Sequence, residues 1–477
     1  MLLTNIRYYG SDHRFHEGEI RIAGGKIAEV MERPDRERAV DPVISAEAGE
    51  QPEGIGDKLT DANGASANRN SAGGIGASKI NATGINAGSL NTEALNDEEN
   101  MILDGQGAYC IPGLIDMHFH GCMGADFSDG TFEALDTISD YEITVGVTGI
   151  APAAMTLPEE KLLEILENAA EFRVQQAMSV DGLAGLTETM EGSHPRGADL
   201  LGVQFEGPFI SRTKTAAQDP RNIRRFDIAL AERFIDAGKG LLKVLGMAPE
   251  MGAPAETQAF CEALRDKVVL SLTHTNADYD TAAAAIRNGV RHATHLFNAM
   301  PAYHHRDPGV VGAVFDSPDV TAELICDGVH IHPSVIRTVF REVGADRVIL
   351  ISDSTRATGM EDGEYTLGGL RVEKRGNQVR LAEGAGKMDD ESCGIPFPMR
   401  QLAGSATNLW DCMKYTVLTA GIPLEDAVRA ATENPAKRLG VFEERGSIAP
   451  GKFADLVLMN EDLTRTMILK RGVVQET

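Results

Sequence analysis

The chain has 477 residues and a mass of 51.1 kDa, and its 45 Lys and Arg against 71 Asp and Glu give a formal net charge of −26. This length suits a large α/β barrel with a satellite domain better than one small module. The content of 42% apolar and 24% charged residues is typical of a globular protein. The acidic balance argues against nucleic acid or an anionic membrane surface as the main partner, although a small anionic ligand needs only local positive charge.

The compartment is indicated by what the sequence lacks. It has no apolar run of about eighteen residues, and Met1–Arg7 does not have the layout of a signal peptide. Six cysteines are scattered without a C-x-x-C pair, at Cys110, Cys122, Cys261, Cys326, Cys393 and Cys412. Isolated thiols of this kind are typical of a reducing compartment. We therefore expect a soluble cytoplasmic protein.

The N-terminal part alternates apolar and polar residues around Gly24-Gly25, which predicts two or three short strands with a tight turn. The composition then changes, because 23 of the 30 residues from Ala62 to Asn91 are Gly, Ala, Ser or Asn. Such a stretch buries little apolar area for each residue that it orders. We expect residues 34–100 to form a flexible insertion without a function of their own.

A barrel is predicted next, because β-rich runs alternate with helix-like segments from Met101 to Asp353. Amphipathic stretches such as Tyr279–Asn288 and Pro333–Glu342 separate several of these runs, and this alternation favours parallel pairing. Eight strands close a (β/α)8 TIM-type barrel. The predicted strands are Leu114–His118, Val147–Ala151, Leu201–Glu206, Leu242–Met247, Val268–His274, Ala293–Leu296, Ala322–Asp327 and Val348–Asp353.

The C-terminal part returns to short strands after two helix-like segments, Asn408–Thr419 and Leu424–Ala430. Ala454–Leu458 and Met467–Leu469 are strand-like and could pair with the N-terminal strands. We therefore expect an α/β protein with a small β-sandwich domain built from both chain ends. The expected ranges are 1–33 and 445–477, with 101–110, for the β-domain and 111–444 for the barrel.

Histidines gather at the predicted strand ends. Ten of the twelve lie between His118 and His332, and barrel enzymes place their chemistry at the carboxyl ends of the strands. The first strand ends in His118-Phe119-His120, whose two imidazoles share a face because side chains at i and i+2 of a strand point the same way.

A metal site is predicted from three other strand ends. Glu206, His274 and His295 offer one carboxylate and two imidazoles, the ligand set of a catalytic zinc site with an open position for water. Asp353, at the end of the eighth strand, could accept the proton of that water. Taken singly, each has an ordinary structural alternative, such as Glu206 or Asp353 capping a helix. Together with the first strand, five predicted strand ends carry metal-type residues, and this coincidence favours the metal site.

The motifs identify a family. His118-Phe119-His120 and Asp353 resemble the metal-dependent amidohydrolase superfamily, and within it the chain resembles the N-acetylglucosamine-6-phosphate deacetylases nearly from end to end outside the insertion. The blocks that carry this resemblance include Pro112–His118, Glu206–Phe209, Leu245–Glu250, His295–Met300, Arg306–Gly309, Asp327–His330, Ala357–Met360, Leu402–Ser405, Asn434–Ala436 and Gly451–Leu456.

The resemblance implies hydrolysis of the 2-acetamido group of N-acetylglucosamine 6-phosphate to glucosamine 6-phosphate and acetate. It implies that Glu206, His274 and His295 bind the main metal, and that Asp353 is general base and acid. His330 would face the acetamido carbonyl, where an imidazole N–H can stabilise an oxyanion.

The resemblance also implies a phosphate site and a dimer. Asn298 and the backbone at Ala299 would hold the sugar phosphate. Arg306 would reach the phosphate of the neighbouring subunit in a homodimer, and a guanidinium suits that role because it pairs with phosphate bidentately. Gln218 stands where family members have a substrate-contacting His, and an amide can still form a hydrogen bond but carries no charge.

Some points stay open. A second metal at His118 and His120 is undecided, since some relatives carry one metal. The ion itself is expected to be Zn²⁺, with Fe, Co or Mn as alternatives for a His/Glu site. Gln204 stands where relatives often have His, and residues 384–398 look like an insertion.

Two other functions compete with this interpretation. One is an amidohydrolase for a different substrate, such as an unphosphorylated amino sugar, an N-acyl amino acid or a cyclic amide. The other is an inactive barrel that serves as a scaffold, which would be expected to lose a ligand or Asp353, whereas this chain has them all.

Overall fold

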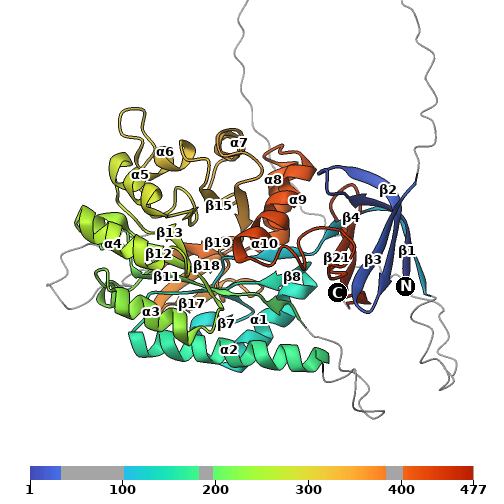
Figure 1. Ribbon diagram of the computed structural model, residues 1–477, viewed down its shortest axis with the longest axis horizontal. Coiled ribbons are helices and arrows are strands. Elements are labelled where there is room, and N and C mark those ends of the chain that lie inside the picture. The colour runs from blue at the N-terminus through green and yellow to red at the C-terminus, as the bar shows by residue number, and fades with distance from the viewer. Residues whose placement is uncertain (34–100, 182–196, 383–400, 476–477) are drawn as a thin grey trace, which may run out of the picture. The chain divides into compact units, whose positions relative to one another are not determined.

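A computed structural model describes residues 1–33, 101–181, 197–382 and 401–475 (Figure 1). The predicted insertions, 34–100 and 384–398, lie outside the described residues. Among the helices of the described residues, none combines the length and the apolar character that a bilayer crossing requires. Five of the six cysteines are free and buried, and Cys393 is outside this part of the chain.

The predicted barrel strands are present and parallel. They are β5 (Leu114–Asp116), β8 (Val147–Ile150), β9 (Ala153–Ala154), β10 (Asp199–Leu200), β11 (Val203–Phe209), β12 (Leu242–Met247), β13 (Val269–Leu272), β14 (His292–Ala293), β15 (Thr321–Ile325) and β16 (Val348–Ile351). Neighbours follow chain order, as β5-β8-β10 and as β9-β11-β12-β13-β14-β15-β16. The last and first strand ends also meet, because the Asp353 N–H donates to the His118 carbonyl at 3.0 Å. This curled parallel arrangement is consistent with a TIM-type barrel.

Helices follow most of these strands and surround them (Figure 1). Two of the helices begin at the residues that the sequence predicts, because Asp278 caps the N-terminus of α5 and Pro333 occupies the first turn of α7. The helices are α1 (Phe132–Thr144), α2 (Glu159–Asp181), α3 (Ile228–Ala237), α4 (Pro254–Leu264), α5 (Tyr279–Asn288), α6 (Gly309–Phe315), α7 (Pro333–Glu342), α8 (Leu409–Leu418), α9 (Leu424–Ala431) and α10 (Glu433–Leu439). Their apolar faces and the strands form one large buried core.

A second sheet joins both ends of the described chain. Its order is β23-β22-β21-β4-β1-β2-β3, where β4 pairs parallel with β1 and antiparallel with β21. The strands are β1 (Leu2–Tyr9), β2 (Phe15–Ala23), β3 (Lys26–Glu32), β4 (Ile102–Pro112), β21 (Leu456–Met459), β22 (Arg465–Lys470) and β23 (Val473–Val474). The predicted pairing of terminal strands is therefore present. Its organisation as a β-sandwich stays a prediction.

Buried ion pairs fasten this sheet to the barrel. Asp199, at the start of β10, contacts Lys470 of β22 at 2.8 Å, Arg445 at 2.9 Å and Arg471 at 3.1 Å. The Asp199 and Lys470 side chains are both almost fully buried. Burial alone would raise the pKa of Asp199, but the charges of Lys470, Arg445 and Arg471 hold it far below the usual range.

A third sheet, which the sequence did not predict, covers part of the barrel mouth. It is antiparallel and has the order β17-β18-β19-β20, with β17 (Gly363–Leu367), β18 (Leu370–Arg375), β19 (Gln378–Leu381) and β20 (Leu402–Ser405). The Ser405 N–H donates to the Asp353 carbonyl at 2.8 Å, so β20 is tied directly to the end of the eighth barrel strand.

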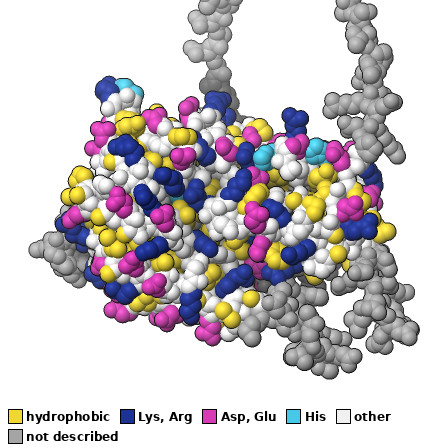
Figure 2. Space-filling view, viewed as in Figure 1, with side chains coloured by type: hydrophobic (Ala, Val, Ile, Leu, Met, Phe, Trp, Pro, Cys, Tyr) yellow, Lys and Arg dark blue, Asp and Glu magenta, His cyan; other side chains and the backbone are white. Residues whose placement is uncertain are grey.

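The exposed surface is mixed in charge. Figure 2 shows acidic and basic side chains interspersed on the face drawn, with hydrophobic side chains scattered between them. The excess of 26 negative charges in the sequence is therefore not gathered into one acidic patch on this face.

Candidate metal centre

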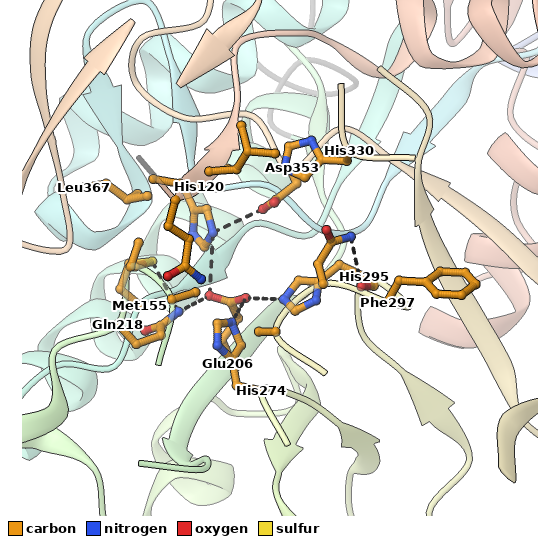
Figure 3. A pocket seen from close by; sticks show the side chains of 18 residues that line it. His120, Met155, Glu206, Gln218, His274, His295, Phe297, His330, Asp353 and Leu367 are labelled. Carbon is orange, nitrogen blue, oxygen red and sulfur yellow. Dashed lines mark hydrogen bonds and ion pairs between the residues drawn. The ribbon is translucent and has the colours of Figure 1, made fainter. Parts of the chain in front are cut away.

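Three side chains predicted as metal ligands meet at the barrel mouth. Glu206 lies in β11, while His274 and His295 each follow a barrel strand by two residues. The Glu206 Oε1 is 3.2 Å from His274 Nε2 and 3.0 Å from His295 Nε2. Figure 3 shows the Glu206 carboxylate between His295 on one side and Gln218 on the other. All three residues are buried, and they form a compact cluster.

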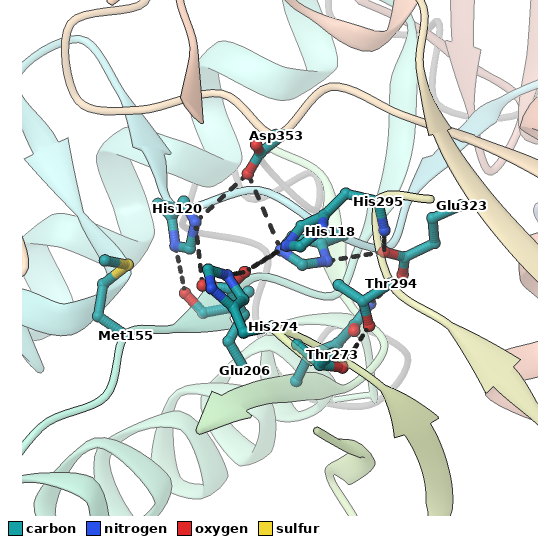
Figure 4. Close-up of polar contacts among 12 residues, drawn as sticks. His118, His120, Met155, Glu206, Thr273, His274, Thr294, His295, Glu323 and Asp353 are labelled. Carbon is teal, nitrogen blue, oxygen red and sulfur yellow. Dashed lines mark hydrogen bonds and ion pairs between the residues drawn. The ribbon is translucent and has the colours of Figure 1, made fainter. Parts of the chain in front are cut away.

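The H-x-H pair extends this cluster. His118 Nε2 is 3.5 Å from Glu206 Oε1, and His120 Nε2 is 3.6 Å from Glu206 Oε2. Asp353 Oδ1 lies 3.4 Å from His120 Nε2 and 3.9 Å from His118 Nε2 (Figure 4). Two groups of three ligand atoms thus share Glu206, and within each group the atoms lie within 4.8 Å of one another.

The Nδ1 atoms of these histidines show which ring nitrogens are free to bind a metal ion. His274 Nδ1 donates to the Lys214 carbonyl at 2.7 Å, and His120 Nδ1 donates to the Ala153 carbonyl at 3.1 Å. A carbonyl only accepts, so in each neutral ring the lone pair is on Nε2 and faces Glu206. Imidazole lone pairs that converge on a carboxylate with no proton between them fit a cation at their centre, and backbone carbonyls behind the rings are typical partners of metal-binding histidines.

The pKa shifts in the cluster also favour a positive charge at its centre. Burial alone would lower the pKa of His120, but the adjacent carboxylate of Asp353 and the charge of Glu206 raise it to about 9. Burial likewise opposes ionisation of Glu206, yet the charge of His274 and hydrogen bonds from the surrounding imidazoles hold its pKa well below normal. Two buried atoms, His118 Nε2 and Asp353 Oδ1, have no hydrogen-bond partner. A cation would satisfy both.

The backbone is strained at three of these positions. His274, His295 and Asp353 have φ values of 44°, 33° and 49°, in the left-handed region that side chains other than Gly rarely adopt. Each such residue costs on the order of 1–3 kcal/mol and persists where the fold holds it in place. Strain at the ends of three barrel strands is typical of a functional site.

A cavity of about 260 Å³ opens above the cluster. Its wall includes Asn298, Ala299 and His330, three residues expected to contact substrate. His330 Nδ1 is 2.8 Å from Asp327 Oδ2; burial lowers the pKa of His330, but this hydrogen bond outweighs burial and raises it. Apolar side chains of Met155 and Leu367, on the opposite side, complete the cavity (Figure 3).

Known proteins share both the sequence and this architecture. Residues 109–475 match the family described as "Amidohydrolase family". The chain belongs to the amidohydrolase family. It is 33% identical to N-acetylglucosamine-6-phosphate deacetylase of Bacillus subtilis (strain 168), over 76% of this chain and 83% of that protein. It is 30% identical to N-acetylgalactosamine-6-phosphate deacetylase of Escherichia coli O157:H7, over 76% and 86%.

A solved structure provides a further comparison for this amidohydrolase. A mutant N-acetyl-D-glucosamine-6-phosphate deacetylase from Mycobacterium smegmatis, in complex with N-acetyl-D-glucosamine-6-phosphate, has a TM-score of 0.70 and 27% identity. The match covers 99% of this chain and 98% of that one. The resemblance stated from the motifs is therefore confirmed.

Two predicted substrate contacts of the amidohydrolase have unexpected surroundings. Gln218 lines the cavity, but its amide group donates to Glu206 Oε2 and its oxygen accepts from the Thr156 N–H at 2.6 Å. Arg306 is exposed, does not line the cavity, and has its NH1 2.6 Å from His305 Nε2. Their roles in substrate binding stay predictions.

Sequence reasoning missed Glu323, a buried carboxylate of β15 that contacts His118. A signal was available, because Glu323 interrupts the otherwise apolar run Ala322–Cys326, and a charge in a buried strand needs partners. The Lys214 carbonyl behind His274 gave no such signal, since a backbone contact depends on how the loop folds.

Proposed function

We propose that this chain hydrolyses the acetamido group of N-acetyl-D-glucosamine 6-phosphate, releasing D-glucosamine 6-phosphate and acetate. The observation that carries the proposal is the buried convergence of Glu206, His274 and His295 on one point beside Asp353. The names of the relatives in Bacillus subtilis and Mycobacterium smegmatis supply the substrate.

Glu206, His274 and His295 would hold the main metal ion, with His118 and His120 available for a second. One carboxylate and two neutral imidazoles are the ligand set of catalytic Zn²⁺, which makes zinc our choice among divalent metals. A cation bound there would polarise the amide carbonyl and bring the pKa of a bound water to about 7.

Asp353 would take the proton of the attacking water and give it to the amine nitrogen as the C–N bond breaks, which frees acetate. In its protonated form, which the neighbouring Asp327 favours, His330 would donate from Nε2–H to the carbonyl oxygen as negative charge develops on it, while Asp327 holds its Nδ1–H. Gln218 would fix the second oxygen of Glu206 and border the substrate. Asn298 and Ala299 would bind the phosphate end.

A galactosamine substrate is the second candidate, because the Escherichia coli O157:H7 relative is named for N-acetylgalactosamine 6-phosphate. The two sugars differ only in the orientation of one hydroxyl. Acetate release should be compared on both 6-phosphates and on unphosphorylated N-acetylglucosamine. The proposal expects the highest kcat/KM on the glucosamine phosphate, and preference for the unphosphorylated sugar would contradict it.

Metal removal gives a direct test of the centre. Dialysis against a chelator is expected to abolish acetate release, and added Zn²⁺ is expected to restore it, because the water is activated only at the cation. Elemental analysis before and after dialysis measures the metal. Full turnover by a chain shown to be metal-free would rule out the proposed mechanism.

Arg306→Ala is expected to raise KM about 30-fold with little change in kcat. A charge-assisted hydrogen bond contributes about 2 kcal/mol, and the phosphate is remote from the bond that breaks. Steady-state kinetics on the 6-phosphate measure this, with Arg341→Ala, on α7, as a matched control. We propose a homodimer in which each Arg306 serves the other subunit. Sedimentation that finds a fully active monomer would contradict the dimer.

The remaining assignments extend the same proposal. We infer that the seven-stranded sheet is the core of a small β-sandwich domain formed by residues 1–33, 101–110 and 445–477, beside a barrel of residues 111–444. The five cysteines within the described residues are free, which supports a cytoplasmic location for the enzyme.

A further inference from the structure

We propose that Glu323 is a positioning residue that fixes the ring of His118 and thereby sets the affinity of the His118–His120 site for a second cation. The inference rests on the proposed function, since it assumes that a first cation occupies Glu206, His274 and His295. It concerns a residue beyond that ligand set, on a different strand.

Glu323 accepts hydrogen bonds from four donors, and its side chain is fully buried. One oxygen, Oε2, accepts from His118 Nδ1 at 2.8 Å and from the His295 backbone N–H at 3.1 Å. The other, Oε1, accepts from His292 Nε2 at 2.9 Å and from the Gln204 amide at 3.2 Å. Figure 4 shows Glu323 on the side of His118 that faces away from Asp353.

These bonds determine which nitrogen of His118 can bind a metal. An ionised carboxylate only accepts, so His118 Nδ1 must carry a proton. In the neutral ring the lone pair is then on Nε2, which lies 3.5 Å from Glu206 Oε1 and 3.9 Å from Asp353 Oδ1. Nε2 is buried without a hydrogen-bond partner. Glu323 thus holds the ring in the one tautomer and orientation that present a ligand atom to the second site.

A purely structural role would not need a charge here. The neighbouring residues of β15 are Ala322, Leu324 and Ile325, all fully buried and apolar. Taking a carboxylate out of water is costly unless donors surround it, and an apolar side chain would avoid that cost. What the carboxylate adds is control of the rings that it contacts, and a carboxylate behind a metal-binding His also makes the ring more basic.

The test counts bound metal and does not depend on turnover. Metal-free wild type, Glu323→Ala and Glu323→Gln are titrated with Zn²⁺ by equilibrium dialysis and elemental analysis. Wild type is expected to bind two equivalents. Both variants should bind the first with an affinity within about threefold of wild type, because Glu323 contacts the ligands of that site only through the backbone N–H of His295 and touches none of their side chains. Loss of a partner behind a metal ligand typically weakens binding 10–100-fold, so the second equivalent should bind about 100-fold more weakly in Glu323→Ala.

Glu323→Gln tests an intermediate loss of affinity for the second equivalent, and it keeps the inference testable if Glu323→Ala does not fold. Its amide oxygen can still accept from His118 but is uncharged, so we expect the second equivalent to bind about tenfold more weakly. Glu433→Ala is the matched control, because Glu433 is also a buried partner of a histidine, His13, far from the centre. It should leave both equivalents unchanged.

Several results would overturn the inference. The first is an affinity for the second equivalent of Zn²⁺ that is unchanged in Glu323→Gln. The second is an equal loss of affinity for both equivalents in a variant whose circular dichroism is native. The third is a wild type that binds only one equivalent. That last result leaves the proposed function standing on Glu206, His274 and His295. Conversely, two equivalents bound without acetate release would refute the function and leave the role of Glu323 intact.

Discussion

Replacing Asp353 with Asn is expected to lower kcat for acetate release by about 1,000-fold, within the range that a positioned proton-transfer group contributes. Asn has nearly the same shape and retains an oxygen toward His120, but it cannot accept the proton of the attacking water. KM should change little, because Asp353 acts on the reacting atoms and not on the phosphate.

Kinetics and metal analysis together check this prediction. The variant should keep the first equivalent of metal, since Glu206, His274 and His295 are intact. Asp362→Asn is a suitable control, because Asp362 is an exposed carboxylate just before β17 and accepts from the Gly376 N–H. If Asp353→Asn retains more than a tenth of the wild-type kcat, another residue must move the proton.

The second large effect concerns stability. Asp199→Asn is expected to lower the free energy of unfolding by about 3–5 kcal/mol, because it leaves the buried cations Lys470 and Arg445 without their shared partner. Urea unfolding at pH 7, followed by circular dichroism, measures the loss. Glu461→Gln is the control, since the exposed pair of Glu461 with Arg7 should contribute less than about 1 kcal/mol.

The pH dependence of this loss has a definite sign. The pKa of Asp199 is depressed in the folded chain, so the unfolded chain binds more protons as the pH falls. The contribution of Asp199 is complete above the ordinary carboxyl pKa near 4 and declines as the pH falls below it toward the folded value. The difference between wild type and variant should therefore shrink in acid. A difference that grows as the pH falls would contradict the ionised pair.

The periodic elements of the barrel could be predicted because their causes are local. α5 and α7 begin where a capping Asp and an N-terminal Pro indicate, and the apolar runs predict the strands. The convergence of Glu206, His274 and His295 also follows from general rules, since parallel strands bring their carboxyl ends to one mouth.

Other features depend on contacts that the sequence does not display. Which nitrogen of His118 faces the centre is decided by Glu323, which comes from a distant strand. The Gln218 amide was assigned to substrate alone, because its bond to Glu206 arises only when the loop after β11 folds back. In the sheet at the mouth, Gly368-Gly369 and Gly376-Asn377 offered turn signals for the hairpins of β17, β18 and β19 that sequence reasoning did not use. β20 gave no such signal, because residues 383–400 separate it from β19 and only the pairing of these two strands reveals it.

The central strand β4 is paired with an early strand, β1, and with a late one, β21. Closing such long loops costs entropy before any contact compensates for it, which makes assembly slow. On the ribosome, β1 can pair with β4 while the barrel is still being synthesised, but the far edge of β4 must wait for Leu456–Met459. Until then it offers unpaired backbone groups to other nascent chains. We expect aggregation during synthesis to depend strongly on this edge, so that expression yield responds to changes in β21 that leave the mature enzyme's kinetics untouched.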